Sequence, residues 1–384
     1  MKILLIGNYI NDHQKSMLLF AEMLKEGLIS IGCEVELIVP QVFFGKFKTR
    51  TCLSKWLGYL DKFILFPMRL KSIVSNLDKK TVIHICDHSN AMYGKNFIAY
   101  SWGITCHDLL AVRSARGEFY ENPTRWSGKI LQKWILSSLA RAPYIACVSE
   151  STRNDLAKFL PQKESVTSII ENGLNEPFRV VAQPELKSAL KRIFSTASLN
   201  LPDSFILHVG SDSWYKNRNF VFKLFASLIR KTGRNDLKLI CIGRNSTNWL
   251  PQIKCYGIAD HVYFFESIES SDLNALYSGA ECLLFPSLAE GFGWPIIEAM
   301  ASGCRVVTSN VPPMSQIAGD VAHLIDPRDC VTATEALEKV LNESLDEKKQ
   351  RIQAGLERVL AFSTDTMVEK YLALFQKISA KYLV

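Results

Sequence analysis

Short apolar runs that alternate with longer amphipathic segments constrain the fold of this chain more than any other feature. Residues 3–6 form an apolar run, a helical pattern with one apolar face follows over about residues 18–28, and a second predicted strand covers residues 34–39. Strand, helix and strand at this spacing predict a βαβ unit with parallel strands.

The same alternation continues along the chain in two series. Further strands are predicted at residues 82–85, 102–106, 144–148 and 166–170, and then at 205–209, 238–242, 262–265, 282–285, 305–308 and 323–325. A less regular, proline-containing stretch separates the series, and a length of 384 residues is typical of two domains.

These patterns predict an α/β fold with two Rossmann-like, doubly wound domains. We assign residues 1–175 to the first domain, 200–363 to the second and 176–199 to a linker, with a last helix at about 364–384 that packs back on the first domain. In open parallel sheets ligands bind at the carboxyl ends of strands, so we expect the active site in the cleft between two facing domains.

Composition excludes several classes of protein. The chain is 48% hydrophobic, yet it has no apolar run of about 18 residues that would span a membrane, and residues 1–7 are too short for a signal peptide. The chain has ten cysteines, and no two of them have Cys-x-x-Cys spacing, which argues for buried thiols rather than a zinc or redox site. We expect a cytoplasmic protein, either soluble or peripheral on the membrane.

The segment from residue 282 to residue 304 has the strongest chemical pattern. A predicted strand leads into a loop with Gly291 and Gly293, and Pro295 suits the first turn of the helix that follows. A helix N-terminus beside a glycine loop binds phosphate through backbone N–H groups and the helix dipole.

Two glutamates flank this loop and helix start. Glu290 precedes the helix and can face the cleft, whereas Glu298 lies about one turn inside and can accept hydrogen bonds from a vicinal diol. The simpler alternative is that both carboxylates only complement the helix dipole. Their place between two predicted strands favours a site for a diphosphate with a sugar on one side and a ribose on the other.

This segment resembles the large family 4 of retaining glycosyltransferases, which has the GT-B fold and a Glu-x7-Glu motif that Glu290 and Glu298 match. The resemblance implies that Glu290 contacts the transferred sugar and supports charge near the anomeric carbon, and that Glu298 binds the nucleotide ribose. It also implies that the donor-binding segment between them holds the sugar, partly through its backbone: Gly291, Phe292, Gly293 and Trp294.

A second segment, which follows the strand at 205–209, supports the same site. Gly210 ends the strand, and Lys216 and Asn217 match the Lys-Asn of the family pattern, although Ser211 and Tyr215 occupy its usual arginine positions. The resemblance implies that Lys216 neutralises the departing diphosphate, and the second cation is Arg218 or Arg244. Such cations do the work that a metal does elsewhere, so we expect neither a metal nor a cofactor. The alternative for Lys216 is a solvated loop lysine.

In the first domain, His107 and Asp108 follow a predicted strand and are similar to the family's His-Asp motif. His107 would polarise a sugar hydroxyl or manage the acceptor proton; the alternative is a packed histidine. Asp87 and His88 follow another strand and are weaker candidates for acceptor contacts. The family's early glycine pair is replaced by residues 8–14, with only Gly7 before them.

We therefore expect a retaining enzyme that moves a hexosyl unit from GDP-mannose or a UDP-sugar to a glycan or lipid-linked acceptor, in polysaccharide or glycolipid biosynthesis. Because the first domain has no obvious carboxylate nucleophile, front-face departure is preferred, with Glu290, His107 and Lys216 as catalytic residues. Two alternatives stay open: a nucleotide-sugar epimerase on the same fold, and a non-catalytic nucleotide-sugar-binding protein.

The window from residue 42 to residue 80 has nine basic residues and two acidic ones, a net charge of +7 that equals that of the whole chain. Aromatic and aliphatic residues alternate with these cations. Such a segment can lie on an anionic membrane or bind an anionic acceptor, and the alternative is a helix that packs on its own domain. No nucleic-acid-binding motif accompanies the charge, so nucleic acid is not an expected partner.

Overall fold

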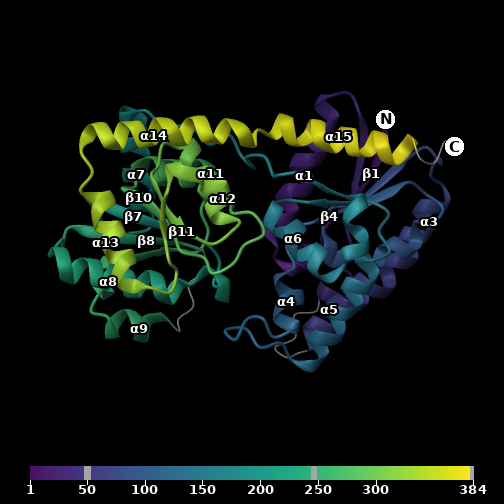
Figure 1. The fold of residues 1–384 in the computed structure, drawn as a ribbon, viewed down its shortest axis with the longest axis horizontal. Coiled ribbons are helices and arrows are strands. Elements are labelled where there is room, and N and C mark those ends of the chain that lie inside the picture. The colour runs from purple at the N-terminus through teal and green to yellow at the C-terminus, as the bar shows by residue number, and fades with distance from the viewer. Residues whose placement is uncertain (47–52, 244–248, 381–384) are drawn as a thin grey trace. The chain divides into compact units, whose positions relative to one another are not determined.

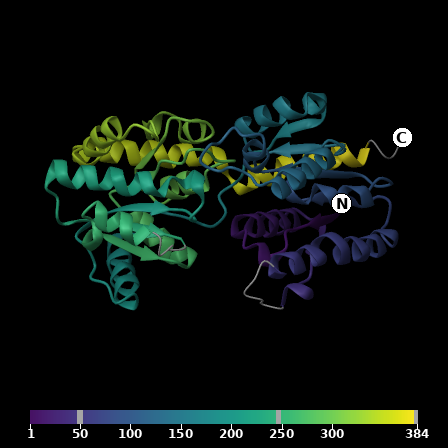
Figure 2. The same ribbon diagram turned by 90° about the horizontal axis from the view of Figure 1, so that it is seen from below.

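A computed structural model describes residues 1–46, 53–243 and 249–380 of the chain (Figure 1). The chain divides into two compact units. Unit 1 combines Met1–Asn175 with Thr364–Val384, and unit 2 is Glu176–Ser363. In each unit, a sheet lies between layers of helices (Figures 1 and 2).

Unit 1 has a six-stranded parallel sheet with the strand order β2-β1-β3-β4-β5-β6. The strands are β1 (Lys2–Ile6), β2 (Glu34–Ile38), β3 (Val82–Ile85), β4 (Trp102–Cys106), β5 (Ile145–Cys147) and β6 (Thr167–Ile169). The order reverses between β1 and β3, where Ile6 pairs with Ile85. Such a reversal opens a crevice at the carboxyl ends of the two strands, where open sheets bind ligands.

The helices of unit 1 cover both faces of this sheet. They are α1 (Lys15–Ser30), α2 (Leu53–Leu60), the π-helical η3 (Asp61–Leu65), α3 (Phe66–Ser75), the 3-10 helix η4 (His88–Asn96), α4 (Leu110–Ala115), α5 (Trp126–Leu139), α6 (Glu150–Phe159) and α15 (Thr364–Ala380). The last of these returns to unit 1 from the end of the chain. Tyr371 of α15 shares a hydrogen bond of 2.8 Å with the hydroxyl of Thr105, which also contacts His84 Nε2 at 2.8 Å, so buried polar pairs fix α15 to the sheet.

Unit 2 has a second six-stranded parallel sheet, in the order β12-β11-β10-β7-β8-β9. The strands are β7 (Ser204–Val209), β8 (Leu237–Ile242), β9 (Val262–Phe265), β10 (Cys282–Phe285), β11 (Val306–Ser309) and β12 (His323–Ile325). The first and fourth strands of the unit are neighbours, which is the Rossmann order, so its crevice lies between β7 and β10.

Helices of unit 2 also pack on both faces of its sheet (Figure 1). They are α7 (Gln183–Thr196), the 3-10 helix η6 (Trp214–Lys216), α8 (Arg218–Thr232), α9 (Leu250–Cys255), α10 (Ser270–Gly279), α11 (Trp294–Ala301), α12 (Met314–Ala318), α13 (Cys330–Leu341) and α14 (Leu345–Val359), with a 3-10 turn, η10 (Leu360–Phe362), at the end. Buried apolar side chains of α8 and α13 form one core with the sheet.

The predicted α/β fold with two doubly wound sheets is confirmed, and each strand begins and ends within one residue of its predicted bounds. Within the described part of the chain, no helix combines the length and the apolar character needed to cross a membrane. All nine described cysteines are free thiols, and six of them are buried, in agreement with the absence of Cys-x-x-Cys spacing.

The prediction of a linker over residues 176–199 is wrong. Residues 183–196 form α7, whose Leu190, Ile193 and Phe194 are buried, and this helix packs against α10 inside unit 2. Pro184 suggested an irregular segment, yet it lies in the first turn of α7, where its missing N–H costs no hydrogen bond. Pro184 therefore marks the start of a helix of unit 2.

Candidate functional site

The two loops that follow β7 and β10 lie side by side at the crevice of unit 2. The backbone N–H of Leu288 donates to the carbonyl of Tyr215 over 2.7 Å. The Nδ2 group of Asn217 donates to the carbonyls of Pro286, at 3.1 Å, and Pro327, at 2.8 Å. Asn217 has a left-handed backbone, with φ of 56°, which asparagine tolerates better than most residues. It therefore holds three loops together beneath the crevice.

Lys216 and Glu290 meet between these loops. Lys216 Nζ donates to Glu290 Oε1 over 2.7 Å, and the two side chains are only 12% and 10% exposed. The same ammonium lies 4.6 Å from the ring centroid of Phe285, the last residue of β10. The crevice thus contains a cation and a carboxylate that are partly withdrawn from water and neutralise one another. Both groups are chemically suited to bind a charged ligand.

Gly210 lies against the Lys216 side chain, and Arg218 in turn contacts Gly210. A Cβ atom at Gly210 would lie 3.0 Å from Lys216 Cδ, so glycine leaves room for the lysine side chain. Arg218 is buried, and its Nη2 donates to the Gly210 carbonyl over 2.6 Å. In this structure Arg218 therefore braces the strand end instead of presenting its guanidinium to the crevice. Arg244, the other candidate for the second cation, lies outside the described residues.

The glycine loop ends at the start of α11. Gly293 is the N-cap residue with φ of 116°, a left-handed conformation that favours glycine, and Trp294 and Pro295 form the first turn. Phe292 is buried, and its ring packs against Phe362 of η10 with centroids 5.8 Å apart. Because the Phe292 side chain is used in packing, the part of this segment available to a donor is its backbone.

Glu298 is buried in the second turn of α11. Its Oε2 accepts a hydrogen bond of 2.9 Å from the hydroxyl of Tyr277, which is fully buried in α10. Burial, together with the neighbouring carboxylate, raises the pKa of Tyr277 well above its usual range, so the phenol keeps its proton and acts as the donor. The sequence does not single out Tyr277, since a tyrosine in an amphipathic helix gives no sign of a distant carboxylate partner.

The crevice of unit 1 contains a denser polar network. Asn8, which follows β1, donates from Nδ2 to Asp87 Oδ2 and to Gln14 Oε1, both over 2.6 Å. The Nδ2 of Asn90 donates to Asn8 Oδ1 over 3.1 Å. Asp87 also accepts from the backbone N–H and hydroxyl of Ser89, at 2.9 and 2.7 Å. Residues 8–14, which replace the family's glycine pair, therefore tie β1 to the end of β3.

Asp87 also pairs with its neighbour His88, whose Nδ1 lies 3.1 Å from Asp87 Oδ1. Burial opposes the charge on Asp87, but the hydrogen bond and positive charge of His88, with the bond from Asn8, lower the pKa of that carboxyl far below its usual range. The pKa of His88 is raised, since its bond to Asp87 outweighs the effect of burial. The pair is thus an internal ion pair of the network.

His107 and Asp108 follow β4 in the same unit. Burial lowers the pKa of His107, so the imidazole is neutral, and its ring packs edge-on against Phe20 with centroids 4.6 Å apart. His107 Nε2 lies 2.8 Å from the carbonyl of Cys86; a carbonyl only accepts, so Nε2 carries the proton and Nδ1 is left as an acceptor. Asp108 Oδ1 accepts from the N–H of Leu110 over 2.9 Å at the start of α4.

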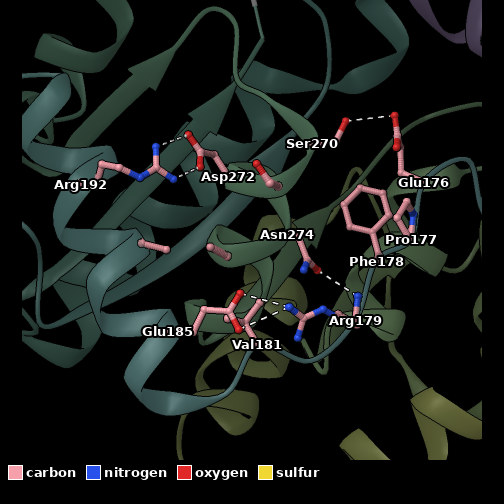
Figure 3. Close-up of a pocket in the computed structure, with 13 residues that line it drawn as sticks. Glu176, Pro177, Phe178, Arg179, Val181, Glu185, Arg192, Ser270, Asp272 and Asn274 are labelled. Carbon is pink, nitrogen blue, oxygen red and sulfur yellow. Dashed lines mark hydrogen bonds and ion pairs between the residues drawn. The ribbon is translucent and has the colours of Figure 1, made fainter.

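Unit 2 also contains a pocket of about 390 Å³ next to α7 and the first turns of α10 (Figure 3). None of the predicted site residues lines it. Its charged groups pair with one another, as Arg192 does with Asp272 and Arg179 with Glu185. The pocket is therefore a separate feature whose charges are satisfied internally. Among residues 1–46, 53–243 and 249–380, no three His, Cys, Asp or Glu side chains are grouped as ligands of a metal ion.

Comparison with known proteins finds a family that most of unit 2 matches. Residues 191–358 match the family of glycosyl transferases group 1. The matched residues cover most of unit 2, and the resemblance to a glycosyltransferase that the sequence suggested is confirmed. Glu290, Glu298 and Lys216 all lie inside the matched residues.

Two curated relatives illustrate the sequence similarity. The O-antigen chain mannosyltransferase RfbU of Salmonella typhimurium is 26% identical over 227 residues, which cover 59% of this chain and 57% of the relative. The MMP alpha-(1->4)-mannosyltransferase of Mycolicibacterium hassiacum is 23% identical over 278 residues, which cover 70% and 62%. The chain thus spans about three fifths of the length of these relatives.

Solved structures share the fold over the whole chain. Sucrose-phosphate synthase from Thermosynechococcus elongatus superposes with a TM-score of 0.77 at 18% identity and covers 99% of this chain and 100% of that one. Anabaena Alr3699/HepE, solved with UDP and glucose, superposes with a TM-score of 0.71 at 15% identity and covers 97% and 98%. These similarities confirm the GT-B class of fold.

Proposed function

We propose that the protein is a retaining glycosyltransferase of the family 4 type, which moves a hexosyl unit from a nucleotide diphosphate sugar to a hydroxyl of a glycan or lipid-linked acceptor. The observation that supports this most directly is the Lys216–Glu290 pair, in the crevice of a Rossmann-ordered sheet that belongs to a glycosyl transferases group 1 domain. A nucleotide diphosphate would find there a cation, a helix start and a carboxylate.

In the proposed reaction the donor diphosphate takes the place of Glu290 beside Lys216. The bond between the anomeric carbon and the phosphate oxygen breaks, and Lys216 and the start of α11 stabilise the charge on the leaving phosphate. Glu290, which the donor has displaced from Lys216, faces the anomeric carbon and supports the positive charge that develops there. The acceptor oxygen bonds to the same face of that carbon, and its proton passes to the leaving phosphate oxygen.

The proposed scheme also gives roles to the other predicted residues. Glu298, fixed by Tyr277, would accept hydrogen bonds from the ribose hydroxyls. His107 presents Nδ1 as an acceptor for a sugar hydroxyl, while Asp87, His88 and Asp108 support the acceptor side of the site. Since Lys216 supplies the cationic neutralisation, we propose that transfer requires no metal ion.

The substrates we propose follow from the relatives. Several of them are named mannosyltransferases, and one solved structure with this fold contains UDP and glucose, so a mannosyl or glucosyl donor is the first choice. An O-antigen chain enzyme among them favours an acceptor in polysaccharide biosynthesis. Residues 42–80 would contact a lipid-linked acceptor or the cytoplasmic face of the membrane.

A thermal-shift screen of GDP-mannose, UDP-glucose and an ADP-sugar tests the donor. A ligand specific to the native state raises the melting temperature, so one nucleotide class should stabilise the protein and the others should not. The stabilising donor is then incubated with a glycan acceptor, and NMR should find the anomeric configuration retained in the product. Glu290→Ala should abolish transfer, whereas Glu335→Ala, at an exposed position of α13, should not affect it.

Three outcomes would contradict the proposal. An inverted product would exclude the retaining mechanism. A changed donor sugar without any acceptor would identify an epimerase, and tight donor binding without turnover of any acceptor would identify a binding protein.

A further inference from the structure

Helix α5 has an exposed apolar stripe on the face opposite its core contacts. Trp126, Ile130 and Trp134, spaced four residues apart, are 76%, 60% and 41% exposed and lie along one side of the helix. The opposite side buries Ile135, Leu136 and Leu139 in the core of unit 1. A helix that needs only one apolar face for its own core therefore has a second one in solvent, which marks an interaction surface.

Positive charge borders this stripe. Lys129 and Lys133 are exposed on α5, Arg125 precedes it, and the helix has no acidic residue. None of these three cations forms an ion pair with a carboxylate among the described residues. The polar part of the exposed face is thus uniformly basic and free to meet an anionic partner.

The stripe continues into the basic window of the sequence. Aromatic rings form a chain from α2 to α5: Trp56 contacts Tyr59 with centroids 5.8 Å apart, Tyr59 contacts Phe63 at 5.3 Å, and Phe63 contacts Trp134 at 5.3 Å. These contacts connect α5 with the continuous helical segment α2–η3–α3 in unit 1 (Figure 1).

The segment α2–η3–α3 also has exposed apolar and basic side chains. Ile64 and Met68 are exposed apolar side chains, and Arg69 and Lys71 are exposed cations. Two segments that lie more than 50 residues apart in sequence therefore meet at Phe63 and Trp134, and both have exposed apolar and basic side chains.

We propose that α5 and α2–η3–α3 form one docking face for an anionic lipid bilayer. Tryptophan and aliphatic side chains partition into the interface between headgroups and acyl chains, while nearby lysine and arginine attract acidic headgroups. A second copy of this chain is a poorer partner, because the same face would bring cations against cations. The docking face is separate from the crevice residues, so the proposal does not rest on the transfer reaction.

Co-sedimentation of the full chain with phosphatidylcholine vesicles, with and without phosphatidylglycerol, tests this proposal. The protein should bind only the anionic vesicles, and high salt should release it. The variant Lys129→Glu/Lys133→Glu should lower binding by at least roughly 30-fold, since each basic residue near such a surface contributes about 1 kcal/mol. The variant Trp126→Ser/Ile130→Ser should lower binding even at low salt, because it removes the inserted apolar groups.

Matched controls distinguish binding through this face from nonspecific binding to vesicles. Lys187→Glu/Lys191→Glu alters two exposed lysines with the same spacing on α7, and Ile98→Ser/Leu345→Ser removes two apolar side chains of similar exposure elsewhere. Both controls should bind as the unmodified chain does, and all variants should keep its melting temperature and its transfer to a soluble acceptor.

The proposal is overturned if the unmodified chain does not bind anionic vesicles, or if the α5 variants bind as well as their controls. A dimer in analytical ultracentrifugation that Trp126→Ser/Ile130→Ser dissociates, without vesicle binding, would instead assign the face to a second copy. Each of these results leaves the proposed sugar transfer intact, because that reaction is measured separately with a soluble acceptor.

Discussion

The two units place different chemistry at the corresponding point of their sheets. In unit 1, Asn8, Asp87 and Asn90 are almost fully buried at the β1–β3 crevice and saturate one another with hydrogen bonds. In unit 2, Lys216 and Glu290 remain partly exposed at the β7–β10 crevice and share one hydrogen bond. A ligand cannot displace the first set without leaving buried polar groups unpaired, whereas it can replace one partner of the second pair. Unit 1 thus holds a fixed scaffold, and unit 2 holds the groups that a substrate can rearrange.

The largest expected effect breaks the scaffold of unit 1. Asp87→Ala removes the acceptor for Asn8 and Ser89 and leaves the positive charge of His88 without its partner. Removing one partner of a buried ion pair costs about 3–5 kcal/mol, so the free energy of unfolding in urea should fall by that amount. Asp346→Ala, at an exposed site of α14, is the control and should cost less than about 1 kcal/mol. Equal losses in the two variants would show that Asp87 is not part of a fixed scaffold.

The second prediction concerns the displaceable pair of unit 2. Lys216→Ala should lower kcat by roughly 10²–10³, because it removes the main charge that stabilises the leaving diphosphate. The free energy of unfolding should fall less than in Asp87→Ala, because Lys216 and Glu290 share a single hydrogen bond and both side chains are partly exposed. Steady-state kinetics and thermal melting measure both effects, with Lys231→Ala, whose ion pair with Glu338 is on the surface, as the control. A large loss of stability with normal kcat would assign Lys216 to the structure instead.

The comparison also shows which features the sequence can predict. Strand positions follow from local apolar runs such as residues 282–285, and the Glu-x7-Glu spacing is a local pattern, so both were accessible. The contacts of Asn8 with Asp87 and of Phe63 with Trp134 join segments that are far apart in the chain. Such pairs depend on strand order and helix packing, and a single sequence does not contain them. Helix α7 was missed for a local reason, because prolines that start a helix resemble those of a linker.

A third prediction uses the buried histidine of unit 2. Burial lowers the pKa of His208 to about 3, and its Nδ1 lies 3.0 Å from the carbonyl of Leu284. Between about pH 6.5 and pH 3 the unfolded chain binds a proton that folded His208 does not, so the free energy of unfolding should fall as pH falls, by up to about 1.4 kcal/mol per pH unit.

His208→Asn, which keeps a donor near Nδ1, should flatten this dependence in urea unfolding measured from about pH 6.5 down to about pH 4.5. In unit 1 the dependence has opposing parts, because the pKa of His84 is lowered to about 3 while that of His88 is raised. The control is His13→Asn, at an exposed position, which should leave the dependence unchanged. An unaltered slope in His208→Asn would show that other groups cause the acid sensitivity.

The smallest expected effect tests whether a fixed element also exists inside unit 2. Tyr277 and Glu298 are both buried and joined by a 2.9 Å hydrogen bond, so this pair resembles the scaffold of unit 1 more than it resembles Lys216 and Glu290. Tyr277→Phe removes one hydrogen bond, worth about 1 kcal/mol, and should weaken nucleotide binding roughly fivefold in calorimetry while kcat is unchanged. Tyr256→Phe, whose hydroxyl bonds to Asn219 at the surface, is the control.

A nucleotide that lacks the ribose 2′-hydroxyl tests whether Tyr277 orients Glu298 toward the ribose or only stabilises the fold. If Tyr277 acts by fixing Glu298 against the ribose, Tyr277→Phe should lower the affinity for the deoxy nucleotide less than it lowers the affinity for the ordinary nucleotide. The two changes act on one contact, so their effects on affinity are not additive. Full additivity would mean that Glu298 does not bind the ribose through that hydroxyl. A fall in kcat with unchanged affinity would group Tyr277 with Lys216 and Glu290. In that case the burial of a side chain would not predict whether a substrate can displace it.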